Sequence, residues 1–393
     1  MKHADFSYTK VKRSEIDILM EVLCKAHLIE KDEYPHVKKF LKLIGLENLR
    51  AVRIGGEIIG GVQLNYWGHF FGGKSVKANG IAFVGIKAEY RRMGAATFMM
   101  NEVIKETCSD GIPISTLFPA NLPLYRKSGY EVAIERKKLK VKLSEIHVRN
   151  MECDMVEVEG KSAKPFRSML REYYSQTNGN IDRNDARWMC YVDPPGEGRT
   201  IKYLIKKDGH AEGYAILLND SKKKEIALVD YALFTRRAGE RLLTFLADHS
   251  SSVKTFRSYG SFADAVLQLL PDLNYELVGL DNGMLRIVSV KNALEARGYP
   301  VGLTGELHFD VADDLIENNN GKFILIVKDG KGRVVKGGKG RLKIDIRTLA
   351  PLYTGYLSPW ELRLCGKFEC PDEDLGIATS VFSGPRPWMR EEF

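Results

Sequence analysis

One stretch of this sequence occurs twice, and a repeated unit restricts the possible folds more than any single motif does. The segment IAFVGIKAEYRRMG, residues 81–94, aligns without gaps on IALVDYALFTRRAG, residues 226–239. The same offset places Gly-Tyr-Glu at 129–131 opposite Asn-Tyr-Glu at 274–276, and each triplet opens a run typical of a strand. The sequence therefore predicts two tandem copies of one α/β unit, followed by a third segment.

Length and composition agree with a folded chain of several domains. The 393 residues exceed one typical domain, and 44% hydrophobic with 28% charged residues is unlike disordered or collagen-like chains. We expect the first copy over 1–148, the second copy over 149–288 and a third domain over 289–393. The chain's last residues, PRPWMREEF, are aromatic enough to dock rather than fray.

The basic residues are spread along the chain rather than gathered into a nucleic-acid surface. The formal charge is +8, but 59 Lys and Arg residues are interleaved with 51 Asp and Glu residues. The densest basic run, residues 328–343, follows the apolar FILIV and favours a hairpin whose turns carry lysines at a solvated sheet edge. Nucleic-acid binding by this run is a minor alternative, which would weaken steeply with added salt.

The sequence predicts a reduced, cytoplasmic protein without a metal site. Its 6 Cys include no Cys-x-x-Cys pair, and its 8 His show no metal-ligand spacing. The first residues lack the apolar stretch of a signal peptide, and no apolar run approaches the length of a membrane span. We therefore expect no membrane partner, no nucleic-acid partner and no metal.

A strand, a turn and a helix follow one another in the first copy. Residues 79–86, NGIAFVGI, are apolar and β-branched as in a buried strand. Residues 95–106 place apolar side chains at helical spacing, which predicts an amphipathic helix with Met99 and Met100 in the core. The string RRMGAA, residues 91–96, therefore lies at the junction between the strand and the helix.

Two strings match phosphate-binding patterns, and their surroundings distinguish them. Residues 68–75, GHFFGGKS, match the GxxxxGK[ST] pattern of a P-loop, but a turn and a strand follow where a P-loop requires a helix. We interpret this string as a turn between two strands. In RRMGAA, small residues let an anion approach the backbone, the first amides of the next helix point toward it, and two arginines add charged donors.

The strand VGI followed by RRMGAA resembles the pyrophosphate-binding motif of the GCN5-related N-acetyltransferases (GNAT), which bind acetyl-CoA at this junction. The wider chain resembles one branch of that superfamily, the Eis (enhanced intracellular survival) acetyltransferases. The similarity includes LYRKSGY at 124–130, the degenerate second copy, residues 346–368 and the ending PRPWMREEF. It implies an α/β (α+β) fold of two tandem GNAT domains with mixed sheets, only the first active, and a C-terminal sterol-carrier-like domain.

By this resemblance the first copy binds acetyl-CoA as its cosubstrate. The backbone around Val84 and Ile86 would pair with the pantetheine arm as an added strand does, and Phe83 would line the acceptor pocket. The residues assigned to the cofactor site are Phe83, Val84, Ile86, Arg91, Arg92, Gly94, Ala95, Ala96 and Asn121. Family members tend to carry Ser where this chain has Ala120. Alanine has no hydroxyl, so a hydrogen bond to the cofactor at this position is not expected here.

Acetyl transfer to an amine requires a base for the amine and an acid for the departing thiolate. The resemblance assigns the acid to Tyr125 and the base to the α-carboxylate of Phe393, which the third domain would deliver into the first domain's site. A free α-carboxyl has a pKa of ~3.5 and is a weak base until burial raises that pKa, but as an anion it also attracts a cationic amine. Tyr130 is predicted to be core, because Tyr275 persists at the same place in the second copy.

The second copy departs from the first at the phosphate-binding string. Glu240 and Arg241 stand where the first copy has Ala95 and Ala96, and an acidic side chain beside a diphosphate weakens its binding. We therefore expect the second unit to be structural.

The resemblance implies an N-acetyltransferase that acts on polycationic amines such as aminoglycosides, with Lys side chains of peptides as a further acceptor class, by direct transfer in a ternary complex. Glu391 and Glu392 beside the tail are candidates for binding such a cation, or two solvated charges. Family precedent also implies a homo-oligomer, a hexamer. The alternative from another class is a non-catalytic acyl-CoA or lipid carrier with the same architecture.

Overall fold

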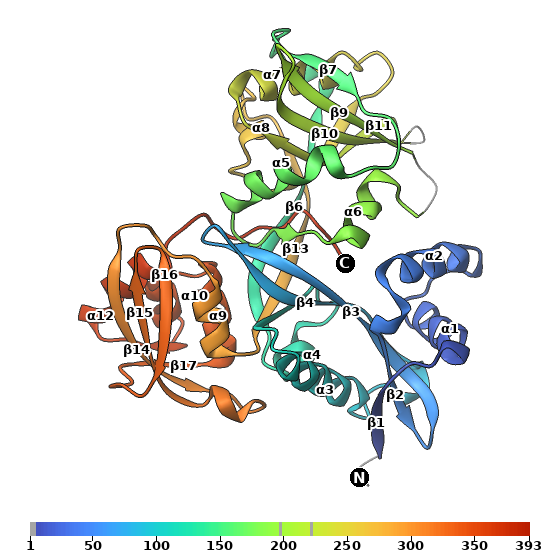
Figure 1. The fold of residues 1–393 in the computed structure, drawn as a ribbon. Coiled ribbons are helices and arrows are strands. Elements are labelled where there is room, and N and C mark those ends of the chain that lie inside the picture. The colour runs from blue at the N-terminus through green and yellow to red at the C-terminus, as the bar shows by residue number, and fades with distance from the viewer. Residues whose placement is uncertain (1–4, 196–198, 221–222) are drawn as a thin grey trace.

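Three units make up the molecule in this computed structural model, which describes residues 5–195, 199–220 and 223–393. In Figure 1 the first unit is blue to teal, the second green to yellow and the third orange to red. Within the described residues, a 13-stranded sheet runs through the first two units, and a 5-stranded sheet lies in the third. No helix in these ranges combines the length and the apolar character needed to cross a bilayer.

The first unit contains the predicted strand and helix. Its elements are β1 (Phe6–Lys10), α1 (Ile16–Ala26), α2 (Tyr34–Ile44), β2 (Leu49–Ile54), β3 (Glu57–Phe71), β4 (Lys74–Ile86), α3 (Ala95–Ser109), β5 (Ile114–Leu117), α4 (Leu122–Arg126) and β6 (Glu131–Lys142). β4 and β5 are parallel neighbours, and α3 is the crossover between them. Met99 and Met100 are buried, as their helical spacing predicts.

The string at 68–75 forms a hairpin turn between β3 and β4, as predicted. Phe71 pairs with Lys74, and the two central residues, Gly72 and Gly73, have φ values of 58° and 80°. Positive φ at both positions matches the twist of the flanking strands, and glycine adopts it without strain. Because β4 rather than a helix follows, the string presents no helix amides to a phosphate.

The second unit repeats the arrangement of the first. Its elements are β7 (Asp154–Glu157), α5 (Lys164–Ser175), β8 (Ile181–Asp182), α6 (Asp185–Val192), β9 (Thr200–Lys207), β10 (His210–Asp220), β11 (Glu225–Leu233), α7 (Arg236–Ala247), β12 (Thr255–Gly260), α8 (Ala265–Gln268) and β13 (Glu276–Ile287). β11 and β12 are parallel, with α7 as their crossover, as β4, α3 and β5 are in the first unit. The predicted duplication is therefore confirmed.

The two copies exchange their last strands. The second half of β6, from the first copy, pairs with β12 of the second copy. The second half of β13, from the second copy, pairs with β5 of the first copy, and β6 and β13 also pair with each other. The strand order is therefore β1-β2-β3-β4-β5-β13-β6-β12-β11-β10-β9-β7, with β8 added beside β3. Each copy completes the sheet of the other.

The third unit is an α+β domain with its own sheet. Its elements are α9 (Val290–Ala296), β14 (Thr304–Ala312), β15 (Gly321–Lys328), β16 (Lys331–Lys336), β17 (Leu342–Asp345), α10 (Ile346–Thr354), α11 (Pro359–Leu364), β18 (Phe368–Glu369) and α12 (Asp372–Val381). The basic run begins in the hairpin of β15 and β16, and β16 is the edge strand of the sheet. This agrees with the predicted solvated edge.

After α12 the chain returns to the centre of the molecule, where its end lies among β3, β13 and α6 (Figure 1). Trp388 forms a parallel bridge with Glu135 of β6, and the backbone N–H of Met389 donates to the Glu135 carbonyl at 2.9 Å. On the other side, the N–H of Trp388 donates to the carbonyl of Asn178 in the second copy at 2.9 Å. The aromatic end is docked, as its composition predicts.

His69 on β3 is a buried contact between the two copies. Its Nδ1 lies 2.8 Å from the carbonyl oxygen of Gly179, and the indole N–H of Trp67 donates to its Nε2 at 3.2 Å. A carbonyl only accepts, so Nδ1 carries the proton. Burial lowers the pKa of His69 from 6.5 to about 4, and the ring is therefore neutral in the folded protein at pH 7.

We expect this histidine to make the free energy of unfolding depend on pH. In the unfolded chain this histidine binds a proton below about pH 6.5, whereas in the folded protein it stays neutral down to about pH 4. The stability that the neutral ring contributes is therefore present above pH 6.5 and is lost as the pH falls toward 4, by about 3 kcal/mol in total. Urea unfolding of the wild type should therefore shift to lower midpoints between pH 7 and pH 4.5, and the shift should be smaller in His69→Asn. Equal shifts in both proteins would contradict the assignment.

Candidate active site

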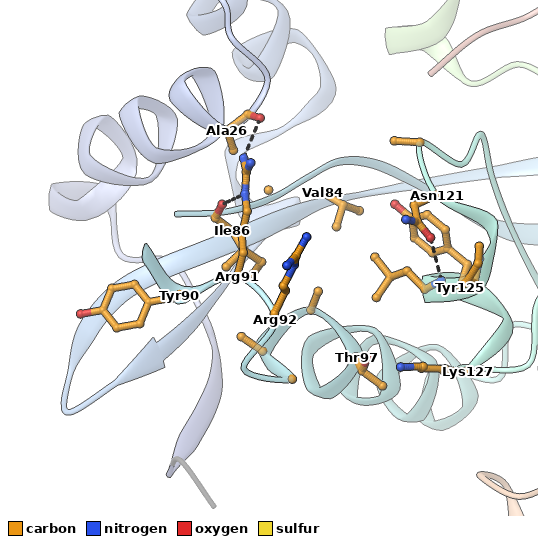
Figure 2. A pocket seen from close by; sticks show the side chains of 17 residues that line it. Ala26, Val84, Ile86, Tyr90, Arg91, Arg92, Thr97, Asn121, Tyr125 and Lys127 are labelled. Atoms are coloured by element: carbon orange, nitrogen blue, oxygen red, sulfur yellow. Dashed lines mark hydrogen bonds between the residues drawn. The ribbon is translucent and has the colours of Figure 1, made fainter. Parts of the chain in front are cut away.

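A cavity of about 700 Å³ lies where the end of β4, the start of α3 and helix α4 meet (Figure 2). The predicted site residues that line it are Val84, Ile86, Arg91, Arg92, Gly94, Ala95, Ala96, Asn121 and Tyr125. Residues that the sequence did not assign also line it, among them Tyr90, Thr97 and Lys127. The cavity is therefore built mainly from the contiguous strand, turn and helix of the first copy.

The end of β4 leaves a backbone edge open to the cavity. β4 pairs with β5 only from Ala78 to Ile81, so its last residues lack this neighbour. A bulge shifts the register of β4 against β3 between Gly61 and Gln63, and Phe83 within the bulge has φ of 54°. The edge around Val84 therefore offers peptide groups to an extended ligand, as the edge of a sheet does to an added strand.

The first turn of α3 offers free amides to the same cavity. Gly94 caps the helix with φ of 95°, a conformation that favours glycine, and the helical hydrogen bonds begin with the N–H of Phe98, which donates to the Gly94 carbonyl at 2.9 Å. Within the described chain, the amides of Ala95, Ala96 and Thr97 donate to no acceptor. Unbonded N–H groups at the positive end of a helix dipole form an anion site.

Basic side chains surround this turn in two roles. The guanidinium of Arg91 donates to the carbonyls of Ile86 and Ala26, both at 3.3 Å, and so supports the turn (Figure 2). Arg92 and Lys127 are exposed, and Figure 2 shows the Lys127 ammonium directed toward Thr97 on α3. These two cations favour binding of a polyanion at the cavity.

Tyr125 lies at the end of α4, with its side chain only 5% exposed. Its ring packs edge-to-face on Tyr130, with centroids 6.2 Å apart. Asn121 holds the start of α4, because its side-chain oxygen accepts the N–H of Leu124 at 3.2 Å. Burial raises the pKa of Tyr125 to about 12, so its phenol stays protonated throughout the physiological range.

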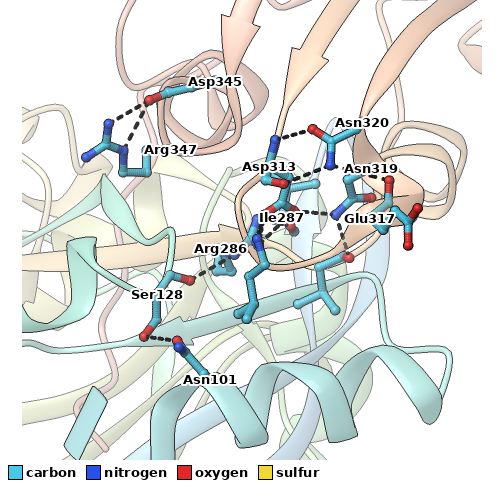
Figure 3. A network of polar contacts seen from close by, with 12 residues as sticks. Asn101, Ser128, Arg286, Ile287, Asp313, Glu317, Asn319, Asn320, Asp345 and Arg347 are labelled. Atoms are coloured by element: carbon cyan, nitrogen blue, oxygen red, sulfur yellow. Dashed lines mark hydrogen bonds and ion pairs between the residues drawn. The ribbon is translucent and has the colours of Figure 1, made fainter. Parts of the chain in front are cut away.

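A buried network that includes Ser128, in the turn after α4, joins all three units (Figure 3). Arg286 of β13 donates to the carbonyl of Ser128, just after α4, at 3.0 Å, and to both carboxylate oxygens of Asp313 in the third unit at 2.7 and 2.8 Å. The hydroxyl of Ser128 in turn donates to Asn101 of α3 at 2.8 Å. The turn after α4 is thus held from a strand of the second copy and a loop of the third unit, and its Ser128 N–H donates to the Tyr125 carbonyl at 2.9 Å.

Comparison with known proteins agrees with this geometry. Models of an acetyltransferase (GNAT) domain match residues 7–133 and 179–287, and a sterol carrier protein domain matches residues 290–390. A GCN5-related N-acetyltransferase from Anabaena variabilis, known from a crystal structure, is 35% identical in sequence to this chain. The match covers 99% of this chain and 100% of the Anabaena chain, and the two structures superpose with a TM-score of 0.95. The chain belongs to the GCN5-related N-acetyltransferases.

Two curated relatives place the chain within that family. An uncharacterized N-acetyltransferase of Streptomyces griseus is 26% identical over 353 residues, covering 82% of this chain and 83% of the relative. The N-acetyltransferase Eis of Mycobacterium tuberculosis is 22% identical over 312 residues, covering 75% of each chain. The chain is thus an Eis-type GNAT acetyltransferase, an enzyme rather than the carrier of the alternative hypothesis, and enzymes of this family use acetyl-CoA.

The second GNAT copy lacks the helix start of the first. Relative to the repeat, α7 begins about one turn earlier than α3, and the hydroxyl of Thr235 accepts the N–H of Ala238 at 3.2 Å. Gly239 therefore lies inside the helix, where a Cβ would come within 2.4 Å of the Leu269 side chain. Glu240 pairs with Arg236 at 2.6 Å. A longer helix, and not only the acidic residue, removes the anion site.

Phe83 and Phe393, both predicted for the site, do not line the cavity. The ring of Phe83 stacks on His27, the residue just after α1, with centroids 4.8 Å apart, because the bulge turns this side chain toward the end of that helix. The ring of Phe393 packs against the rings of Trp67 and Phe118, with centroid distances of 4.7 Å and 5.7 Å. Phe118 lies between β5 and α4, so the tail reaches the segment that leads directly into the cavity lining.

The two glutamates of the tail have different surroundings. Glu391 is fully buried and pairs with Arg183 at 2.6 Å, so the prediction that it is free to bind an acceptor is wrong. A side chain that neutralises a buried arginine is not available to a solvated cation. The side chain of Glu392 is 65% exposed and pairs with Arg136 at 3.0 Å. Of the two, only Glu392 faces solvent.

A negative charge at Thr97 is expected to weaken acetyl-CoA binding without weakening the fold. Thr97 is the third residue of α3, where Glu favours the helix dipole but repels a diphosphate. In Thr97→Glu the KM for acetyl-CoA should rise about tenfold, the equivalent of ~1.4 kcal/mol, with an unchanged or higher melting temperature. Thr97→Gln is the uncharged control. Equal KM values in the two variants would mean that the diphosphate lies elsewhere.

Proposed function

We propose that the enzyme transfers the acetyl group of acetyl-CoA to amino groups of polycationic amines such as aminoglycosides, with Lys side chains of peptides as a further class. The observation that carries the proposal is the cavity, in which an open strand edge, free helix amides and a protonated, buried Tyr125 come together. An elongated thioester with a diphosphate fits these groups. The strand edge would pair with its amide arm, and the first turn of α3, with Arg92 and Lys127, would bind its phosphates.

The proposed reaction is a direct transfer in a ternary complex. The lone pair of the neutral amine attacks the thioester carbonyl carbon and forms the N–C bond. The C–S bond then breaks, and the sulfur leaves as the thiolate of CoA. Tyr125 gives its hydroxyl proton to the departing sulfur, and the α-carboxylate of Phe393 takes a proton from the amine nitrogen. Solvent exchange restores both groups, and the products are the N-acetylated amine and CoA.

Charge near the tail supports a cationic acceptor. Arg136 pairs with Asp281 at 2.6 Å and with Glu392 at 3.0 Å, so two carboxylates share one guanidinium. The α-carboxylate of Phe393 adds a further negative charge next to Glu392. A surplus of negative charge attracts polycations and steers them toward the site.

The three units would divide the work. We assign catalysis to residues 1–148, a structural role to residues 149–288, and delivery of the tail to residues 289–393. The capped helix of the second copy and the docked tail support this division. A homo-oligomer is also proposed, because β13 exposes neighbouring apolar side chains at Leu277, Val278 and Leu280. Light scattering of the purified chain measures its mass directly.

The release of CoA from acetyl-CoA tests the function. The purified enzyme is incubated with a panel of aminoglycosides, polyamines and Lys-containing peptides, and the free thiol and the acetylated product are measured. We expect turnover that is fastest with the most highly charged small amines. Turnover confined to singly charged amines would refute the acceptor class, and no turnover with any amine would refute the proposed reaction.

A further inference from the structure

Charged side chains that the proposed reaction does not use hold the last residues of the chain. Asp230 of β11, in the second copy, is fully buried and accepts hydrogen bonds from Arg183 at 2.7 and 3.0 Å and from Arg390 of the tail at 3.0 Å. Arg183 also donates to Glu391 of the tail at 2.7 Å. Two arginines and two carboxylates therefore alternate in a buried cluster that joins the tail to the second copy.

Further contacts to the second copy fix the same segment. The backbone N–H of Arg390 donates to the side-chain oxygen of Asn180 at 3.1 Å. The Arg390 guanidinium donates to the carbonyl of Tyr231 at 2.8 Å and lies 3.9 Å from the centroid of that ring. Arg187 of α6 donates to the carbonyl of Glu392. Backbone, charge and ring contacts thus act on consecutive tail residues.

The repeat shows which position of the first copy corresponds to Asp230. Asp230 aligns with Gly85, which lies near the end of β4 and lines the cavity of the first copy. A Cβ at Gly85 would come within 2.9 Å of Ala26, so this position has no room for a side chain in the first copy. In the second copy the same strand position carries a carboxylate that contacts the tail. The strand that lines the cavity in one copy holds the tail in the other.

We propose that the degenerate second copy is the anchor that positions the C-terminal tail, with Asp230 as its central positioning residue. The inference rests on the proposed role of Phe393 in catalysis. Without the Asp230 charge, Arg183 keeps Glu391 at 2.6 Å, but Arg390 is left with Asp264 at 3.9 Å as its nearest carboxylate. A buried arginine without a close partner is strongly unfavourable, so this loss should release Arg390 and its neighbours. Arg390 is close to Phe393 in the chain, and a displacement of about 1 Å at a reacting group costs roughly 100-fold in rate.

Hydrogen exchange and kinetics on the full-length Asp230→Asn variant test the anchor. We expect exchange of the amides at 388–392 to rise about tenfold or more, while that of α3 stays unchanged. In the same variant kcat should fall about 100-fold with an unchanged KM for acetyl-CoA. The control is Asp248→Asn, which removes an exposed carboxylate of the second copy that pairs with Arg149 at 3.6 Å. It should change neither measurement.

Two results would overturn the proposal: tail amides that remain protected in Asp230→Asn, or a released tail with full turnover. If this variant does not fold, Glu391→Gln, which removes a charge at the edge of the cluster, is measured in the same way, and unchanged exchange and kcat there would also refute it. A wild-type enzyme that acetylates no amine would refute the proposed function instead. Comparing amide hydrogen exchange at 388–392 between the wild type and Asp230→Asn would still decide whether the second copy holds the tail.

Discussion

Replacing Tyr125 by Phe is expected to lower kcat by about 10²- to 10⁴-fold, the usual contribution of a positioned proton donor. The phenol is buried, and with a pKa of about 12 it is protonated whenever the enzyme works. A thiol has a pKa of ~8.5, so the departing thiolate needs a donor mainly while the C–S bond breaks. The KM for acetyl-CoA should stay within about twofold, because the helix amides and strand edge are unchanged. Steady-state kinetics with varied acetyl-CoA measure both quantities.

Tyr130→Phe is the matched control for this prediction. Tyr130 is also buried, and its hydroxyl lies 2.7 Å from the Ser115 hydroxyl rather than in the cavity lining. Its removal should cost about 1 kcal/mol of stability and leave kcat within about twofold. Similar kcat values for Tyr125→Phe and the wild type would refute Tyr125 as the acid. A large loss in Tyr130→Phe would point to packing as the common cause.

Extending the chain by three glycines after Phe393 is expected to lower kcat by about 10²-fold or more. The extension turns the α-carboxylate into a neutral amide and moves the new carboxylate away from the amine, so the proposed base is lost. The melting temperature should hold, because the ring contacts of Phe393 with Trp67 and Phe118 remain possible. Turnover and thermal unfolding are compared on the same preparation.

Phe393→Leu separates the carboxylate from the ring. This variant keeps the α-carboxylate but loses two aromatic contacts, which are worth about 0.5–1.5 kcal/mol each beyond the buried area. We expect a modest loss of kcat, well below that of the extended chain. If the extended enzyme turns over normally, the base lies elsewhere in the site. If Phe393→Leu is as slow as the extended enzyme, the ring rather than the carboxylate is what the reaction requires.

Most of the cavity was predictable because its parts are close together in the sequence. The buried strand, the turn and the first residues of α3 occupy 79–97, and local periodicity and small residues are enough to place them. Tyr125 and Asn121 were found through resemblance to a family motif, and Lys127 was missed although it lies in the same motif. For a lysine just after a short helix, no local sequence pattern distinguishes a side chain that lines a cavity from one in open solvent.

The sequence by itself determined the duplication, the turn between two strands at 68–75, a hairpin at the basic run 328–343, and the strand-turn-helix order that creates the anion site. These features depend on near neighbours along the chain. Only the tertiary structure revealed the exchanged strands β6 and β13 and the burial of Glu391 against Arg183, 208 residues away in the sequence. Pairing between such distant segments depends on shape and charge that form only when the units assemble. From the sequence alone, a glutamate next to the chain end is predicted to be exposed to solvent, because the buried arginine that pairs with it is not known.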